Sequence, residues 1–143
     1  MDVGATYFNP FALAHAMSDK KPRILVVEDE DNIALALEFL MTREGYDHAR
    51  IADGALALSG IRDMHPDLVL LDIMLPGASG YEICAGVRRD PSLNDVKILM
   101  MTARGSAIEK RKGLEIGADG FITKPFELRD LRAEVRRLLP PIG

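Results

Sequence analysis

The sequence predicts an α/β domain in which helices cover both faces of a parallel sheet. Five short apolar runs alternate along the chain with segments that have helical spacing. Most of these runs are almost continuously apolar, as expected for strands that are buried on both sides. Polar residues follow several runs directly. In a parallel sheet these positions share the edge formed by the carboxyl ends of the strands, where such folds bind ligands.

Each strand and helix is predicted from its own residues. The apolar runs lie at 24–27, 48–52, 67–71, 96–101 and 119–122. The first and last helical segments repeat apolar residues on one helix face, at Ile33, Leu37, Leu40 and Met41 and at Leu128, Leu131, Val135 and Leu138. Shorter helices are expected near 54–64, 79–89 and 106–116. Five β-α units with right-handed crossovers give a doubly wound, five-stranded parallel sheet with five helices.

Length and composition indicate one globular domain. The 143 residues, 48% of them hydrophobic, are sufficient for a single core. A net charge of −4 argues against direct binding of nucleic acid by this chain. The single cysteine, Cys84, excludes an internal disulfide and is typical of a reducing compartment, so we expect a cytoplasmic protein. No apolar run is long enough to cross a membrane, and no membrane partner is expected.

The first 21 residues differ from the rest of the chain, because their aromatic and apolar residues show no period. The stretch begins with Asp2, and Pro10 interrupts its apolar segment, which argues against a secretory signal peptide. We expect a flexible N-terminal extension at 1–21 and a folded domain at 22–140. A partner-binding role for the aromatic residues of the extension stays open.

Polar groups at the ends of three predicted strands suggest one kind of chemistry. Glu28 and Asp29 follow the first strand, Asp72 follows the third, and Lys124 follows the fifth. Carboxylates that are brought together repel one another and contribute little to holding a fold together. With one lysine, however, they are well suited to holding a divalent cation beside a phosphoryl group.

The same residues lie in motifs that resemble the receiver domains of bacterial two-component response regulators. The matching motifs are Glu28-Asp29-Glu30, Pro66-Asp67, Asp72, Pro76-Gly77, Gly80 with Glu82, Thr102-Ala103, Gly117-Ala118-Asp119 and Thr123-Lys124-Pro125-Phe126. The resemblance covers about Pro22 to Leu139. It implies a flavodoxin-like fold, as in chemotaxis regulators, with strand order 2-1-3-4-5.

The resemblance also implies a reaction and a cofactor. Asp72 would take a phosphoryl group from a phosphohistidine of a sensor histidine kinase or a phosphotransfer protein, giving an acyl phosphate. Mg²⁺ would be bound by Asp29, Asp72 and the backbone carbonyl of Met74, with Glu28 acting through water, and Mn²⁺ could substitute. Such a protein catalyses only its own phosphorylation and dephosphorylation and is not otherwise an enzyme.

The phosphoryl group would be bound by the Thr102 hydroxyl, the Ala103 backbone and Lys124, next to a cis peptide bond between Lys124 and Pro125. By the same resemblance, Thr102 would move toward the phosphoryl group while Phe121 turns inward. Phe121 lacks the hydroxyl of the Tyr that is commoner at this position. This switch would remodel the face formed by the fourth helix, the fifth strand and the fifth helix.

Many receivers of transcription factors dimerise through that face with paired charges. Two such pairs have counterparts here, Lys110 with Asp130 and Glu115 with Arg136. A third does not, because Gly120 and Glu134 stand where an acid and a base are expected, and Arg111 replaces an apolar contact. Solvated helix charges explain these residues equally well, so a self-dimer and a downstream protein target both stay open.

Two residues at the mouth of the predicted site bear on the lifetime of the acyl phosphate. Met74 and Arg104 lie two residues beyond Asp72 and Thr102. Neither is well suited to orient an attacking water, so we expect a comparatively long-lived acyl phosphate.

The alternatives differ in class. A haloacid-dehalogenase-type phosphatase needs a second acid where this chain has Met74, and a flavodoxin-like flavin binder needs a phosphate loop that Glu28-Asp29-Glu30 would repel. A receiver that never takes phosphate is disfavoured because every expected site residue is present. Since the sequence stops at Gly143, we expect either a stand-alone receiver or the receiver of a DNA-binding transcriptional regulator without its effector domain.

Overall fold

The computed structural model describes residues 21–103 and 105–139. Five strands form one parallel sheet in the order β2-β1-β3-β4-β5, which confirms the predicted fold class and strand order. The strands are β1 (Arg23–Val27), β2 (Asp47–Ile51), β3 (Leu68–Asp72), β4 (Lys97–Thr102) and β5 (Gly120–Thr123). The helices are α2 (Asp31–Glu44), α3 (Ala57–Met64), α4 (Gly80–Arg88), α5 (Ala107–Ile116) and α6 (Leu128–Leu138). Almost all of the expected extension at 1–21, as well as Arg104 and Pro140, lies outside the described residues.

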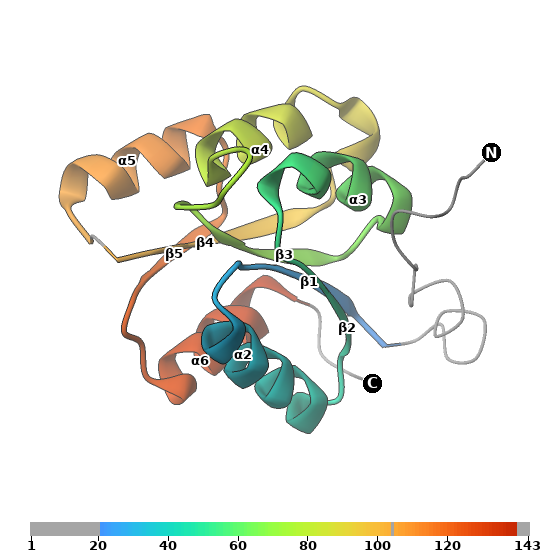
Figure 1. The fold of residues 1–143 in the computed structure, drawn as a ribbon, viewed down its shortest axis with the longest axis vertical. Coiled ribbons are helices and arrows are strands. Elements are labelled where there is room, and N and C mark those ends of the chain that lie inside the picture. Colours follow the sequence, from blue (N-terminus) through green and yellow to red (C-terminus); the bar gives the residue numbers. More distant parts are fainter. Residues whose placement is uncertain (1–20, 104, 140–143) are drawn as a thin grey trace.

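The sheet separates two apolar layers. Helices α2 and α6 cover one face, and α3, α4 and α5 cover the other (Figure 1). Alternate strand residues supply the two layers: Leu25 and Val27 pack on the α3–α4 side, while Ile24 and Val26 pack on the α2–α6 side. Because both faces are covered, the apolar residues of β1 and β3 are buried without interruption. Among the described residues, no helix is both long and apolar enough to span a membrane.

Local side-chain contacts set the helix ends. The Ser79 hydroxyl accepts a hydrogen bond from the Glu82 N–H, and the Glu82 carboxylate accepts one from the Ser79 N–H, so α4 begins with a capping box. Gly45, at φ 85°, ends α2 in a left-handed conformation that glycine adopts without strain. The segment predicted as one helix at 54–64 is divided into a 3₁₀ turn at Gly54–Leu56 and then α3, with Asp53 capping the Ala55 N–H.

The carboxyl ends of β3 and β4 extend one residue further than the apolar runs predicted. Asp72 pairs in register with Met101, and Thr102 pairs with Thr123, because the parallel ladder continues past the last apolar side chain. The expected site residues Asp72 and Thr102 are therefore the last residues of strands and not the first residues of loops. Their backbones are fixed by the sheet.

Candidate functional site

The carboxyl edge of the sheet brings the predicted site residues together. Glu28 and Asp29 follow β1, Asp72 ends β3, Thr102 ends β4 and Lys124 follows β5. One carboxylate oxygen from each of the three acids lies within 4.8 Å of the others. Glu28 and Asp72 are buried, with exposed fractions of 0% and 3%, whereas Asp29 is exposed. We call this cluster of three acids with Lys124 the acidic edge.

Lys124 is the cation of the acidic edge. Its Nζ lies 2.8 Å from Glu28 Oε1 and 3.4 Å from Asp72 Oδ1, and the side chain is 13% exposed. Burial lowers the pKa of Lys124, but the hydrogen bond to Glu28 and the charges of both carboxylates outweigh this effect and raise it. The lysine is therefore charged and reaches both buried acids at once.

Asp72 is held in an environment that opposes its ionisation. Burial, followed by the charge of Glu28, raises its pKa to about 6, while Lys124 and the Met74 N–H act in the opposite direction. The Met74 N–H donates to Asp72 Oδ1 at 3.3 Å. At neutral pH the Asp72 side chain is mostly ionised and can act as a nucleophile, but below about pH 6 it is mostly protonated.

The loop after β1 is fixed around Glu28. The Glu28 N–H donates to the carbonyl of Ile51 at 3.1 Å, and the Glu28 carboxylate accepts the Glu30 N–H at 3.1 Å. Glu30 forms the N-cap position of α2, and Asp31 lies in its first turn, as expected for acids at a helix start. The loop thus places the exposed Asp29 at the mouth of the cluster.

Thr102 and Lys124 are joined through their backbones. Thr102 is buried, and its carbonyl accepts the Lys124 N–H at 2.6 Å. The peptide bond between Lys124 and Pro125 is cis. Ala103 is exposed and, with Lys124 and Pro125, lines a groove of about 730 Å³ that runs toward α2. One side of the acidic edge is therefore accessible from outside.

Phe121 on β5 is half-buried against the apolar layer on the α3–α4 side. A Cβ at Gly113 of α5 would lie 3.4 Å from the Phe121 ring, so the helix and the ring are in close contact. The Phe121 ring therefore packs directly between β5 and α5.

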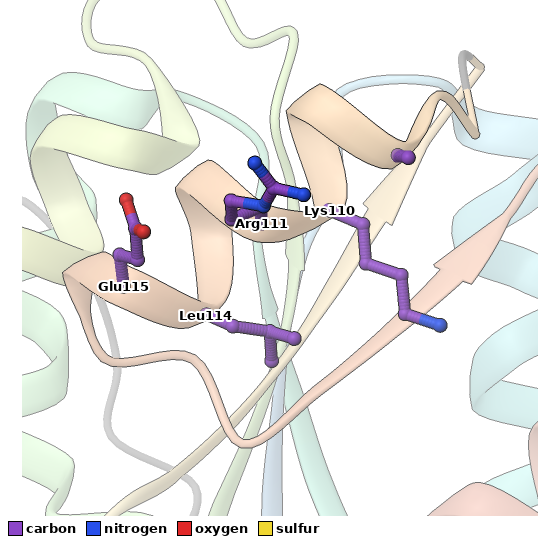
Figure 2. Close-up of a pocket in the computed structure, with 5 residues that line it drawn as sticks. Lys110, Arg111, Leu114 and Glu115 are labelled. Carbon is purple, nitrogen blue, oxygen red and sulfur yellow. The ribbon is translucent and has the colours of Figure 1, made fainter.

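The charged residues of α5 and α6 have different surroundings. Lys110, Arg111, Leu114 and Glu115 line a shallow surface pocket on α5 (Figure 2). Arg136 of α6 is already paired within the chain, because its Nη2 lies 2.8 Å from the Glu44 carboxylate on α2. Sequence reasoning did not anticipate this contact, since nothing in the spacing of two distant helices indicates which of their ends meet.

The chemistry of the acidic edge fits a hard divalent cation. Three carboxylates that converge without nitrogen or sulfur ligands are the donor set that Mg²⁺ prefers, and an exposed Asp29 leaves room for water. A buried carboxylate with an adjacent lysine also suits transfer of an anionic group to Asp72. Sequence reasoning placed these residues at one edge but missed the direct contact between Lys124 and Glu28.

Comparison with known proteins agrees with this geometry. Residues 24–136 match the response regulator receiver domain family. The DNA-binding response regulator MtrA of Mycolicibacterium smegmatis is 43% identical over 123 residues, which cover 86% of this chain and 53% of MtrA. The sensory transduction protein RegX3 of the same organism is 44% identical over 116 residues, covering 81% of this chain and 50% of RegX3. The chain thus spans about half the length of these curated relatives.

Solved structures show the same fold. The BeF3-activated receiver domain of RstA from Klebsiella pneumoniae superposes with a TM-score of 0.76 at 30% identity, covering 83% of this chain and 99% of that one. The chemotaxis response regulator CheY4 of Vibrio cholerae has a TM-score of 0.79 at 28% identity, with the same coverage of 83% and 99%.

Proposed function

Because the chain belongs to the response regulator receiver domain family, we propose that Asp72 accepts a phosphoryl group from a phosphohistidine of a sensor histidine kinase or a phosphotransfer protein. The observation that carries this proposal is the buried Asp72 carboxylate, with Lys124 Nζ 3.4 Å from its Oδ1 and two further acids alongside. An Asp72 oxygen attacks phosphorus, the bond from phosphorus to the imidazole nitrogen breaks, and that nitrogen keeps the electron pair. The reaction changes only the protein itself and its donor.

One set of residues at the site would bind the phosphoryl group, and a second set would bind the metal ion. Lys124, the Thr102 hydroxyl and the Ala103 N–H would bind the phosphoryl oxygens, which is the electrostatic positioning that phosphoryl transfer mainly needs. Asp29, Asp72 and the Met74 carbonyl would hold Mg²⁺, or Mn²⁺ in its place, with Glu28 acting through water. The cation, when bound, neutralises charge that the acids and the phosphoryl group share.

The output of the reaction would be a change on the surface formed by α5, β5 and α6, which we call the output face. Thr102 and Phe121 would change position together, and the contact between Phe121 and Gly113 supports transmission to α5. Lys110, Glu115, Asp130 and Arg136 would then take part in a self-dimer or in binding a downstream protein. We place these events in the cytoplasm, because one buried thiol and no disulfide suit a reducing compartment.

A second reading is favoured by the relatives themselves. MtrA is named a DNA-binding response regulator, and this chain spans about half of its length. The chain could therefore be the receiver portion of a transcriptional regulator, in which case the output face would control a DNA-binding part. The phosphoryl chemistry is the same in both readings.

The proposal is tested with acetyl phosphate and Mg²⁺. We expect the intact protein to gain the mass of one phosphoryl group, and we expect no gain in Asp72→Asn or after chelation of the metal. Asp53→Asn is the matched control, because Asp53 caps a 3₁₀ turn on the surface and should leave phosphorylation unchanged. A phosphoryl group that still forms on Asp72→Asn would refute the assignment of the acceptor.

A further inference from the structure

Arg50 makes two contacts near the acidic edge that have no role in the proposed reaction as described above. It lies on β2, the edge strand, opposite Val26 in the β1–β2 register. Its Nε donates to the backbone carbonyl of Glu28 at 3.0 Å, and its Nη1 donates to Asp31 Oδ1 at 2.9 Å. One guanidinium therefore holds both ends of the short loop that contains Asp29.

The contact with Glu28 bears directly on Asp29. The Glu28 carbonyl belongs to the peptide group that joins Glu28 to Asp29, and peptide groups are planar. Fixing this carbonyl therefore fixes the direction in which the chain enters Asp29. The Asp29 side chain is exposed and makes no hydrogen bond to another residue that the structure describes, so its position depends on its backbone.

We propose that Arg50 is a positioning residue that pre-orders Asp29 for binding the divalent cation. This inference rests on the proposed function and deepens it, because it assigns the support of one metal ligand to a residue outside the cluster. Side chains that orient metal ligands in this way commonly contribute strongly to affinity. Arginine suits the task because its planar guanidinium donates to two acceptors in a fixed geometry, which lysine does not reproduce.

The charge of Arg50 would by itself have the opposite effect. A cation beside the acidic edge repels Mg²⁺, so removing it should strengthen metal binding if charge alone mattered. Removing the two hydrogen bonds should weaken metal binding if Arg50 positions Asp29. The direction of the change therefore separates the two explanations.

Stability alone does not account for this arginine. Its Nη2 is buried and has no hydrogen-bond partner within the described part of the chain. Burying a donor in this way costs free energy, which offsets part of what the other two nitrogens contribute. We therefore expect replacement of Arg50 to change metal binding more than it changes folding.

The test is calorimetric titration with Mg²⁺ of the wild-type protein, Arg50→Gln and Arg50→Lys. We expect both variants to bind Mg²⁺ roughly tenfold more weakly. The Mg²⁺ concentration that half-saturates phosphorylation by acetyl phosphate should rise by the same factor, while the rate at saturating Mg²⁺ changes little. Asp31→Ala removes one of the two contacts and should give a smaller loss, which provides a second measurement if Arg50 variants fold poorly.

His48→Gln is the matched control. His48 also joins β2 to α2, with Nδ1 3.0 Å from Glu38 and Nε2 2.8 Å from the Thr42 hydroxyl, but it contacts residues far along α2 from the acidic edge. Its loss should lower stability in urea without changing Mg²⁺ affinity. Unchanged or tighter binding in Arg50→Gln, or full affinity in Arg50→Lys, would overturn the proposal. A wild-type protein that neither binds Mg²⁺ nor takes a phosphoryl group would instead refute the proposed function.

Discussion

The acidic edge and the output face both carry charged residues, but their surroundings differ. At the acidic edge, Glu28 is 0% exposed and meets Lys124 at a single short distance. On the output face, the Arg136 side chain is 61% exposed and pairs with Glu44 of α2, whereas pairing with Glu115 of a second copy is the proposed alternative. A buried charge is held to one partner because losing that partner costs several kcal/mol. An exposed charge can change partners because an exposed ion pair contributes about 1 kcal/mol or less.

Among the substitutions considered, removal of Lys124 from the acidic edge should change the free energy of unfolding most. In Lys124→Met the buried Glu28 and Asp72 lose their shared cation, and breaking a buried pair in this way costs about 3 kcal/mol. We expect that loss in the free energy of urea unfolding measured with a metal chelator, and partial recovery with Mg²⁺, which binds the folded state. Lys97→Met at the exposed start of β4 is the control and should change stability by less than about 0.5 kcal/mol. Equal losses in the two variants would contradict the role of Lys124.

The pH dependence of stability should carry the signature of Asp72. Its pKa is raised from 3.8 to about 6 in the folded protein. Between about pH 4 and pH 6 the folded state therefore keeps a proton on Asp72 that the unfolded state has lost. The contribution of Asp72 to stability is therefore greatest below pH 4 and falls as pH rises toward about 6, by on the order of 3 kcal/mol. Urea unfolding of the wild-type protein and Asp72→Asn, in chelator from pH 4 to 7, should give a difference that follows this sign. A difference that grows in the opposite direction would contradict the raised pKa.

The mouth of the acidic edge should set the lifetime of the acyl phosphate. Met74 is 74% exposed and its side chain carries no group that could orient water, and Arg104 lies outside the described residues. Met74→Asn with Arg104→Glu introduces polar groups that can position an attacking water, and we expect loss of the phosphoryl group to become about tenfold faster, or 1.4 kcal/mol in barrier. The decay is measured after removal of acetyl phosphate, with Ile108→Asn on exposed α5 as control. No acceleration in the double variant would refute the explanation.

Substitutions of charged residues on the output face should have the smallest effect, and that effect should be on self-association. Glu44→Gln removes the negative charge that pairs with Arg136 on α2, which should make Arg136 more available to Glu115 of a second copy. We expect association of the form treated with Mg²⁺ and beryllofluoride to tighten two- to fivefold, within the range of about 1 kcal/mol for exposed pairs. Sedimentation equilibrium measures this change, and Arg136→Gln should show the reverse. If all three proteins stay monomeric while the mimic binds, the proposed self-dimer through this face is refuted.

The same contrast explains how much of the structure could be predicted from the sequence. The buried strands could be predicted because a strand covered on both faces needs an uninterrupted apolar run, as in Leu68–Leu71. Asp72 and Lys124 could be placed at one edge because parallel strands share their carboxyl ends. The exact strand ends were missed by one residue, since polar Asp72 and Thr102 still pair within the ladder.

Contacts between distant side chains could not be predicted. Arg50 is one of three polar residues on the short edge strand β2, and one of its two acceptors is a backbone carbonyl 22 positions earlier in the chain. Backbone acceptors have no sequence signature. The pairing of Arg136 with Glu44 spans 92 positions and depends on how two helices align on the sheet. Both contacts follow from packing and not from local pattern.

The lysine within the acidic edge also determines which ions can satisfy the site. Three carboxylates and one ammonium group leave two negative charges in excess when all are ionised. One divalent ion cancels that excess, whereas one sodium or potassium ion cancels only half of it. The resting protein should therefore select among cations by valence before size or geometry is considered. Ordinary monovalent salt at cellular concentration should be a poor competitor for the site.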